Sequence, residues 1–399
     1  MRWLLFVLLF TGLASCQADK SDSVLKRNLR VVEFDIDQPS REVWLHEAFE
    51  MEFIPVIDQE KIPLFNVNKV RSFGENLAVL SRENIWIIDI EGTVINRIGK
   101  VGNGPGEYQK AIDFRVDMDK NSVEILDEQS QKIVEYDLKG NFKSEIRGEA
   151  FHLAKNFIKI SEDIYAVYGG VFFSGIFDHR LIYFSKEKKK VINKFFPVRF
   201  DRTYTAFVER DNFWIEEGKV YFSFTFNDVI YELTPEGLVP DVTLNFGEHT
   251  FPPDILERDF QDVREFMEFC ETTSFVYHIT DHNQIDGVNF FAYEYKGQKS
   301  YGIYSADSDK GTSLLKPKNE LYDKLYYFLK YPKGVNQKWV YFDIEPSRLL
   351  SEFDEVRKSL SQQEWRELKN ANLGIFQLYE GLSSEDGNIL VKSTLKNVF

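Results

Sequence analysis

Short runs in which apolar and polar residues alternate, separated by polar turns, recur along most of the chain. Between residues 97 and 142 a glycine-rich loop leads into three such runs, at 112–117, 122–126 and 132–137. Alternation with a period of two, bounded by turns, is typical of β-strands. Further runs, many of them apolar on both faces, occupy residues 76–81, 85–89, 93–98, 220–224, 228–233, 274–280, 289–295 and 299–305. The pattern predicts an all-β fold whose sheets are covered on both sides.

A turn signature recurs among these strands at a nearly constant interval. It ends at Gly92, Gly140, Lys188 and Gly237, which lie 48, 48 and 49 residues apart. A period near 50 residues with several short strands per unit indicates a β-propeller, because helical repeats of that length would show stripes with a period of 3.6 residues. The next turn, at residues 307–311, comes later than this period requires.

Two predicted helical insertions account for the extra length. Apolar residues recur at helical spacing after Pro252, at Leu256, Phe260, Val263 and Met267. This spacing predicts an amphipathic helix over about residues 252–270, and the same pattern predicts a second helix over about residues 346–370. Without the insertions, the repeated region is roughly 285 residues long, which corresponds to six repeats.

A closed ring needs a strand from one end of the chain to complete the unit begun at the other end, since an open sheet edge would otherwise remain. Residues 49–57 and 388–395 are the candidates for this pair. We therefore expect one domain over residues 29–399, a six-bladed β-propeller with the two helical insertions packed outside the ring. No linker rich in Pro, Gly and Ser interrupts the repeat.

The glycine loop resembles part of a known repeat. Residues 102–108 read GNGPGEY and residues 135–141 read EYDLKGN, and together they resemble the NHL type of β-propeller repeat. The chain as a whole resembles six-bladed β-propeller lipoproteins of Bacteroidetes, which share the glycine stretch and a late helical insertion. This resemblance implies the fold, an occurrence near glycan-uptake and sensing systems, and no general activity. The loop does not have the glycine spacing of a nucleotide-binding loop, and the residues after it predict a strand.

The first 28 residues predict export and a lipid anchor. Residues 1–15 combine Arg2, an apolar run and small residues before Cys16, which is the pattern of a signal peptide too short for a membrane span. The tetrad LASC resembles a bacterial lipobox, so we expect lipid on Cys16; an ordinary signal peptide is the alternative. Residues 16–28 are polar and predict a tether. We expect the protein in the cell envelope, lipid-anchored in the outer membrane, on its periplasmic or surface side.

Charge and cysteine content exclude several classes of partner. The formal net charge is −15, and an acidic chain repels phosphate backbones and anionic membrane surfaces. We therefore expect no nucleic-acid binding and no membrane contact except through the anchor. The basic run at residues 186–190 predicts a solvated hairpin turn. With lipid on Cys16, Cys270 has no disulfide partner in the chain and is expected to be a buried, inert thiol.

Two clusters resemble metal sites, and each favours another interpretation. Asp117 and Glu128 frame a run close to a calcium loop, but Ser122 stands where that loop needs glycine and the next residues predict a strand. His278 and His282 have a zinc-ligand spacing that suits a helix, whereas His278 lies at the end of a predicted strand. We therefore predict no metal and no cofactor, and no motif assigns a catalytic or ligand-binding residue.

Two hypotheses of function follow. The first is a lipid-anchored binding or scaffold module for a glycan, a peptide or a partner protein. The second is a periplasmic or surface hydrolase or lyase with a metal in the central channel, because propeller lactonases and amidating lyases resemble this fold. The inner strands appear mostly apolar in sequence, with Asp113 and His278 as exceptions, so the binding role is favoured and enzymatic activity is left open. Aromatic clusters at residues 290–293 and 326–328 are expected to fill space between blades.

Overall fold

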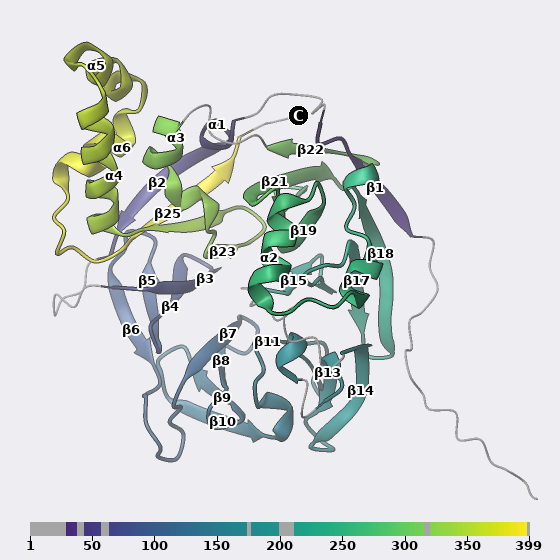
Figure 1. Ribbon diagram of the computed structural model, residues 1–399. Helices are drawn as coiled ribbons and strands as arrows, with labels where there is room; N and C mark the ends of the chain where they lie inside the picture. Colours follow the sequence, from purple (N-terminus) through teal and green to yellow (C-terminus); the bar gives the residue numbers. More distant parts are fainter. Residues whose placement is uncertain are drawn as a thin grey trace, which may run out of the picture.

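The computed structural model describes residues 29–37, 44–56, 64–173, 177–198, 211–314 and 320–396. Within these residues the protein is mostly β-structure, with four four-stranded sheets and one nine-stranded sheet arranged around a common axis (Figure 1). The fold is therefore propeller-like, as the strand pattern predicted. No described helix is long and apolar enough to cross a membrane.

The strands follow the chain around the ring. The first two four-stranded sheets contain β3 (Val67–Phe73), β4 (Asn76–Ser81), β5 (Asn84–Asp89) and β6 (Val94–Ile98), then β7 (Ala111–Asp117), β8 (Ser122–Asp127), β9 (Lys132–Asp137) and β10 (Phe142–Arg147). The third contains β11 (Asn156–Lys159), β12 (Ile164–Tyr168), β13 (His179–Ser185) and β14 (Lys190–Pro197). The nine-stranded sheet contains β15 (Phe213–Glu216), β16 (Lys219–Phe222), β17 (Val229–Thr234), β18 (Gly237–Asn245), β19 (Val276–Ile285), β20 (Val288–Tyr295), β21 (Gln298–Ser305), β22 (Lys310–Leu314) and β1 (Arg30–Phe34). The last four-stranded sheet contains β23 (Gly334–Val335), β24 (Val340–Ile344), β25 (Ile389–Leu395) and β2 (Phe49–Pro55), which follows the short helix α1 (Leu45–Ala48).

Burial within a sheet explains the sequence pattern. All six residues of β8 and five of the six in β4 are buried, because both faces of these middle strands pack against neighbouring sheets. The outer strand β10 differs, since only Ile146 of its six residues is buried. Runs that are apolar on both faces therefore mark the middle strands.

The first strand of each run lies nearest the axis. β3, β7, β11, β15, β19 and β23 contact one another in this order, and β23 contacts β3 again, so the inner strands form a closed cycle (Figure 1). Next to the last contact, Val70 N of β3 donates a backbone hydrogen bond of 2.8 Å to the oxygen of Lys333, the residue before β23. Side chains on the axial side of these strands therefore approach one another although they are far apart in sequence.

The two ends of the chain complete one sheet together. β2 pairs with β25 in antiparallel fashion over its whole length, from Phe49 opposite Leu395 to Pro55 opposite Ile389. This is the pairing expected between residues 49–57 and 388–395. It covers the edge that β25 would otherwise expose and ties the last sheet to the start of the ring.

The strand β1 joins two runs of strands, and the sequence pattern did not predict it. It is parallel to both neighbours, pairing with β18 from Arg30 to Glu33 and with β22 at Glu33 and Phe34. Its alternate residues Val32 and Phe34 are buried, while Val31 is exposed. β1 therefore fills the wedge between two adjacent runs and merges them into the nine-stranded sheet.

The helix expected over residues 252–270 is shorter than predicted. A short 3-10 turn, η5 (Pro253–Glu257), comes first, and the α-helix α2 (Val263–Thr272) starts only after Asp262. The carboxylate of Asp262 accepts a hydrogen bond of 2.9 Å from Glu265 N and so caps the helix. Leu256 and Phe260 lie before the helix but pack on the same apolar cluster as its buried face, which is why the spacing suggested one continuous helix.

The helix expected over residues 346–370 is broken into several. The structure has α4 (Pro346–Ser359), α5 (Gln362–Ala371) and α6 (Leu373–Gly381), with α3 (Glu320–Leu325) and the 3-10 turn η6 (Tyr327–Lys330) before β23. The region does not form one continuous helix because a capping box starts α5. The Ser361 side chain accepts a hydrogen bond from Glu364 N, and the Glu364 side chain accepts one from Ser361 N. These helices lie at one side of the ring, as expected for an insertion (Figure 1).

The glycine loop connects β6, at the outer edge of one sheet, with β7, at the axis. Gly106 has a φ of +70°, and its carbonyl oxygen accepts a 2.5 Å hydrogen bond from the buried Tyr136 hydroxyl. Gly104 instead donates its N–H to Glu107 Oε2 at 2.7 Å, and its φ does not lie in the left-handed region. The loop thus has one position where glycine is conformationally required and one where it is less so.

This difference gives a test of the loop. Gly106→Val should lower the free energy of unfolding by about 2 kcal/mol or more, because valine at positive φ is strained and its Cβ would lie 2.7 Å from Phe142 Cγ. Gly104→Val should cost less than about 1 kcal/mol, because its Cβ would meet the flexible side chain of Glu107. Urea unfolding of both variants measures the difference, and equal losses would contradict this account of the loop.

Candidate functional site

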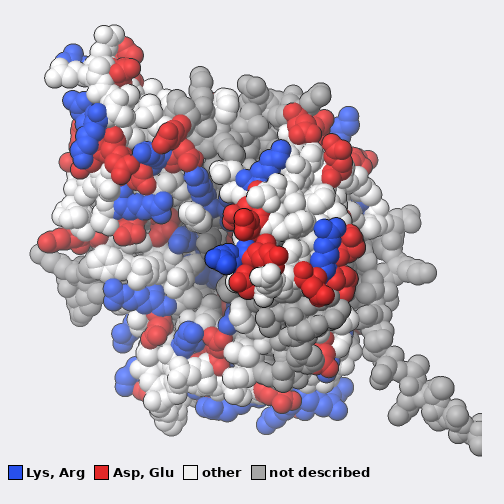
Figure 2. All heavy atoms as spheres, in the orientation of Figure 1, with Lys and Arg blue, Asp and Glu red and all other residues white. Residues whose placement is uncertain are grey.

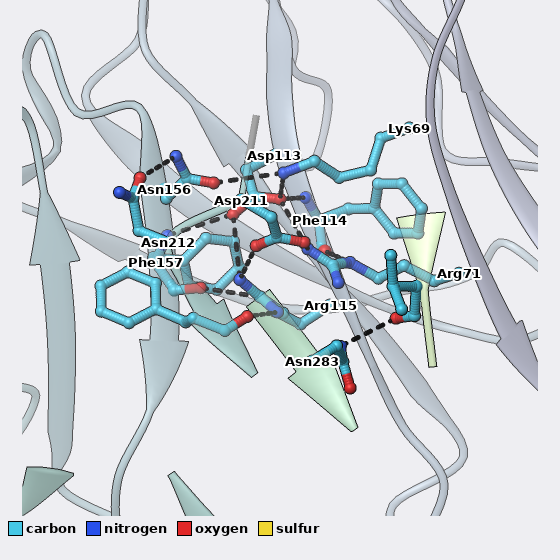
Figure 3. Close-up of polar contacts among 12 residues, drawn as sticks. Lys69, Arg71, Asp113, Phe114, Arg115, Asn156, Phe157, Asp211, Asn212 and Asn283 are labelled. Carbon is cyan, nitrogen blue, oxygen red and sulfur yellow. Dashed lines mark hydrogen bonds and ion pairs between the residues drawn. The ribbon is translucent and has the colours of Figure 1, made fainter. Parts of the chain in front are cut away.

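Five charged side chains meet at the axis of the ring. Lys69 and Arg71 extend from β3, Asp113 and Arg115 from β7, and Asp211 from the residues just before β15 (Figure 3). We call these five residues the axial ion network. Positions two residues apart on one strand share a face, so each of the two strands directs two charges toward the axis.

The two carboxylates of the network each bind more than one cation. Asp113 Oδ1 lies 2.6 Å from Lys69 Nζ and 3.2 Å from Arg71 Nη2. Asp211 bridges the two guanidinium groups, with its oxygens 2.9 Å from Arg71 Nη2 and 2.9 Å from Arg115 Nη2. Asp113 is fully buried, so it is stable as an ion only because these partners compensate its lost hydration.

The arginines also tie adjacent inner strands together through the backbone. Arg71 Nε donates to Phe114 O at 2.7 Å, and Arg115 Nε donates to Phe157 O at 2.8 Å. The contact of Arg115 is thus the same as that of Arg71, in the next sheet around the ring. Each arginine therefore joins its own strand to the next inner strand, which fixes the register of three neighbouring sheets.

Two asparagines extend the network toward the fourth inner strand. Lys69 Nζ donates to Asn156 Oδ1 at 3.2 Å, Asn156 Nδ2 donates to Asn212 Oδ1 at 2.9 Å, and Asn212 Nδ2 donates to Ser223 O at 2.9 Å. Both asparagines are almost fully buried. Their amides are thus paired, as buried polar groups require.

The axial ion network contains three cations and two carboxylates. Burial alone would raise the pKa of Asp211, but Arg71, Lys69 and Arg115 hold it far below its ordinary value. Burial lowers the pKa of Lys69 and outweighs the attraction of Asp113, and the charges of Arg71 and Arg115 lower it further. Burial and the nearby Arg71 also lower the pKa of Arg115. Burial would also lower the pKa of Arg71, but Asp211 and Asp113 outweigh it and raise that pKa. The two carboxylates therefore stabilise the charged form of Arg71 most, while burial disfavours the charged forms of Lys69 and Arg115.

A cavity of about 490 Å³ adjoins the network at the end of the channel where the inner strands end. We call it the axial cavity. Arg71 and Arg115 form its inner part, and the turn between β23 and β24 forms part of its rim with Asn336, Gln337 and Trp339. The axial cavity is also lined by four aromatic residues and an amide, namely Trp214, Phe73, Phe213, Tyr341 and Asn283. The cavity thus combines guanidinium groups, amides and indole rings.

A hollow of about 910 Å³ lies at the opposite end of the channel. Its lining includes Lys69, Arg82, Lys110 and Lys155 together with Glu83 and Glu128. Glu128 already pairs with Lys155 at 2.6 Å and with Lys110 at 3.3 Å. Figure 2 shows basic side chains around the middle of the molecule and acidic side chains gathered over α2. Because Lys69 lines this hollow while Arg71 and Arg115 line the axial cavity, the axial ion network lies between the two.

The expectation that inner strands are mostly apolar was wrong. The sequence singled out Asp113 as a polar exception on an inner strand, and this residue lies at the centre of the site. The sequence analysis did not identify the other four members of the network, Lys69, Arg71, Arg115 and Asp211. A signal was present in the two inner strands, because each contains two charged residues on either side of one apolar residue. Lys69 and Arg71 flank Val70, and Asp113 and Arg115 flank Phe114. The sequence did not show that these pairs meet.

The two histidines singled out by spacing have separate environments. β19 continues to Ile285, beyond the predicted end at Thr280, and its pairing with β20 shifts register twice between Tyr277 and Asn283. His278 Nδ1 lies 2.9 Å from Glu294 Oε1, whereas His282 Nε2 lies 3.0 Å from the Tyr304 hydroxyl. They therefore do not share a ligand.

The remaining candidates behave as local structure. Asp117 Oδ1 accepts from Lys120 N at 3.0 Å in a tight turn, and Glu128 pairs with lysines, so the two do not form a calcium loop. Burial raises the pKa of the Cys270 thiol to about 12, which is consistent with the inert thiol expected.

Residues 186–189 form the turn between β13 and β14. The aromatic residues at 290–293 and 326–328 are buried in the core. Cys16 lies outside the described residues.

One group of potential metal ligands was found among the described residues, and it is away from the axis. Asp37, Glu248 and His249 place their ligand atoms within 4.8 Å of one another, with both acids exposed. His249 already uses both ring nitrogens, at 2.7 Å from Ser274 O and 2.8 Å from Asp37 Oδ2. The group is satisfied as a hydrogen-bonded surface cluster.

The axial ion network makes a prediction about acid stability. Asp211→Asn should lower the free energy of unfolding at pH 7 by about 3 kcal/mol, because the two guanidinium groups would keep only their longer contacts of 3.2 and 3.7 Å to Asp113. The folded pKa of Asp211 is depressed below its ordinary 3.8, so its stabilising contribution is present above that pH and is lost as the pH falls further. In urea unfolding, the gap between wild type and variant should be constant from pH 7 to 5 and shrink below pH 4. The exposed control Asp119→Asn should show no gap, and a gap that does not change with pH would contradict the assignment.

Comparison with solved structures identifies similar folds. A putative exported protein from Bacteroides fragilis has a TM-score of 0.66 at 15% identity, covering 92% of this chain and 100% of that one. A member of the DUF4221 family from Bacteroides vulgatus has a TM-score of 0.51 at 11% identity, covering 87% and 96%. Virginiamycin B lyase from Staphylococcus aureus reaches 0.41 at 11% identity, covering 74% and 81%, which is too distant to bear on activity. At these identities the likeness shows the propeller-like fold alone.

Sequence comparison places the chain in a family. No match was found among curated proteins. A family model described as a domain of unknown function (DUF4934) matches residues 38–374. This range spans most of the chain and includes the inner strands, the axial ion network and the rim of the axial cavity. The protein therefore belongs to the DUF4934 family, whose members share this domain of unknown function.

Proposed function

We propose that this protein is a lipid-anchored ligand-binding module of the cell envelope, built on a six-bladed β-propeller. Four four-stranded sheets, together with two four-stranded runs inside the nine-stranded sheet, support the count of six blades. The signal-like N-terminus with Cys16 and the exported neighbour from Bacteroides fragilis support the location. The ligand is a glycan, and it binds in the axial cavity.

The lining of the axial cavity carries this proposal. Sugars present apolar ring faces and many hydroxyl groups, which suit indole rings beside planar hydrogen-bonding groups. The rim residues Trp339, Asn336 and Gln337 and the deeper Arg71 and Arg115 supply both. In the inner part, Arg71 Nε and Nη2 are engaged in the network, and its Nη1 has no hydrogen-bond partner among the described residues. This group remains available to an oxygen atom of a ligand.

The site also argues against metal chemistry at the axis. The two axial carboxylates, Asp113 and Asp211, bind Lys69, Arg71 and Arg115, so the positions where a metal would find ligands are taken by cations of the chain. A divalent ion would have to displace them against like-charge repulsion. The binding role is therefore the better account of this arrangement.

A binding experiment tests the location of the site. The purified soluble domain, residues 17–399, is applied to a glycan array, and hits are confirmed by titration calorimetry. Trp339→Ala should weaken binding at least tenfold, because it removes an indole from the rim. Trp86→Ala removes a similar ring from β5 outside the cavity and should leave affinity unchanged once both variants are shown to fold by their melts. Equal binding by wild type and Trp339→Ala, or no glycan bound at all, would contradict the proposal.

The anchor is tested separately. We expect wild-type protein in the membrane fraction with incorporated acyl label, and Cys16→Ala protein in the soluble fraction without label, because the thiol of Cys16 is the proposed attachment point. The matched control Cys270→Ala keeps the proposed lipid site and should remain in the membrane fraction. Retention of Cys16→Ala in membranes, with no acyl label on the wild type, would contradict a lipid anchor.

A further inference from the structure

A second cavity opens beside the axial cavity, between the two halves of the nine-stranded sheet. It has a volume of about 320 Å³ and is lined by residues of both halves and of β1. We call it the interblade cavity. Its polar lining includes Arg30, Glu216, Asp241, His282, Asn289 and Tyr304. The cavity forms because β1 lies between β18 and β22 and keeps these two strands apart. The space on the axial side of β1 is not filled by a strand.

The two cavities share a wall. Trp214 lines both of them. On β15, Ile215 lines the axial cavity and its neighbour Glu216 lines the interblade cavity. On β19, Asn283 lines the axial cavity and its neighbour His282 lines the interblade cavity. Successive residues of a strand point to opposite faces, so β15 and β19 each present side chains to both cavities. The cavities are therefore adjacent, with Trp214 between them, at the end of the channel where these strands end.

The interblade cavity has a different charge from the axial one. Glu216 and Asp241 contribute two carboxylates, and Arg30 contributes a guanidinium that stacks 5.5 Å from the centre of the Tyr304 ring. Burial raises the pKa of Glu216, and its Oε1 accepts a 2.5 Å hydrogen bond from Gln284 Nε2. Hydrogen-bond donors of a ligand would compensate that burial. The axial cavity, by contrast, ends on Arg71 and Arg115.

We infer that the two cavities are adjoining subsites for one acidic oligosaccharide of at least two sugar units. This inference rests on the proposed glycan-binding function and specifies its ligand. The unit in the axial cavity carries a carboxylate that approaches the guanidinium groups of Arg71 and Arg115, which line this cavity. The next unit passes Trp214 and places its hydroxyl groups against Glu216, Asp241 and Arg30.

The chemistry of the second subsite favours a sugar over a peptide side chain. A hydroxyl group both donates and accepts, so vicinal hydroxyls can pair with a carboxylate and a guanidinium at once. An apolar side chain would displace water from Glu216 and Asp241 and bring no hydrogen-bond donor to either carboxylate, which is costly. The volumes of the two cavities, 490 and 320 Å³, lie in the range of small-molecule sites and leave room for at least one ring each.

The test compares chain length and charge. Titration calorimetry on the soluble domain uses the monomer to the tetramer of two acidic series, each with one terminal uronate, galacturonate or glucuronate, followed by uncharged β-1,4-linked galactose units. Oligomers of β-1,4-linked galactose alone are the uncharged counterparts. For at least one acidic series, affinity should rise at least tenfold from monomer to trimer, because only the longer chain reaches both subsites. The galactose oligomers should bind at least tenfold more weakly than the acidic trimer, and salt should weaken binding of the acidic trimer.

Variants locate the second subsite. Glu216→Gln combined with Asp241→Asn should weaken trimer binding at least fivefold and leave monomer binding unchanged. Glu217→Gln, an exposed neighbour that lines neither cavity, should change neither.

The outcomes separate this inference from the proposed function. The acidic two-subsite ligand would be overturned if monomer and trimer bound with equal affinity, or if a galactose oligomer bound as well as both acidic series. In either case, weaker glycan binding by Trp339→Ala would still support glycan binding at the axis. Trimer binding that survives the double variant unchanged would also overturn the inference. Failure of every glycan on the array and in these titrations would contradict the proposed function itself.

Discussion

The structure depends on one buried carboxylate, that of Asp113. It binds Lys69 and Arg71 from the preceding inner strand, and its second oxygen accepts a 3.1 Å hydrogen bond from Phe157 N on the following one. A carboxylate that is fully buried would be unstable without such partners. Asp113 therefore holds three neighbouring inner strands in one mutual position. A shift of β3 would separate it from Lys69 and Arg71, and a shift of β11 would remove the hydrogen bond from Phe157.

The same network shapes what the channel can bind. It lies between the axial cavity and the basic hollow at the other end of the channel. The three cations exceed the two carboxylates, in a chain whose net charge is −15. Positive charge is thus concentrated at the axis while acidic groups gather elsewhere, for example over α2 (Figure 2). A negatively charged group of a ligand is attracted to the axis and repelled by much of the remaining surface.

The insertion of β1 shapes the second cavity. A strand from the N-terminal side of the chain is parallel to two strands that end successive runs, and its first residue, Arg30, lines the interblade cavity. The segment that precedes β1 leads back to Cys16. The wall of one cavity is therefore formed by the part of the domain nearest the proposed membrane anchor.

The sequence by itself determined many of the strands and the repeat to which they belong, although not β1. Period-two alternation, turn residues and a 48-residue interval give β4, β5, β8 and β9 to within a residue or two, because these features depend on local burial on both faces of a strand. The helices were less well predicted, because helical spacing of apolar residues shows which side is buried but not whether Ser361 or Asp262 starts a new helix. Only the tertiary structure decided the site. Lys69, Asp113 and Asp211 are separated by 44 and 98 residues, and their interaction depends on the closure of the ring, which no local pattern encodes. The same holds for Trp214, which lines two cavities only because β1 holds two runs of strands apart.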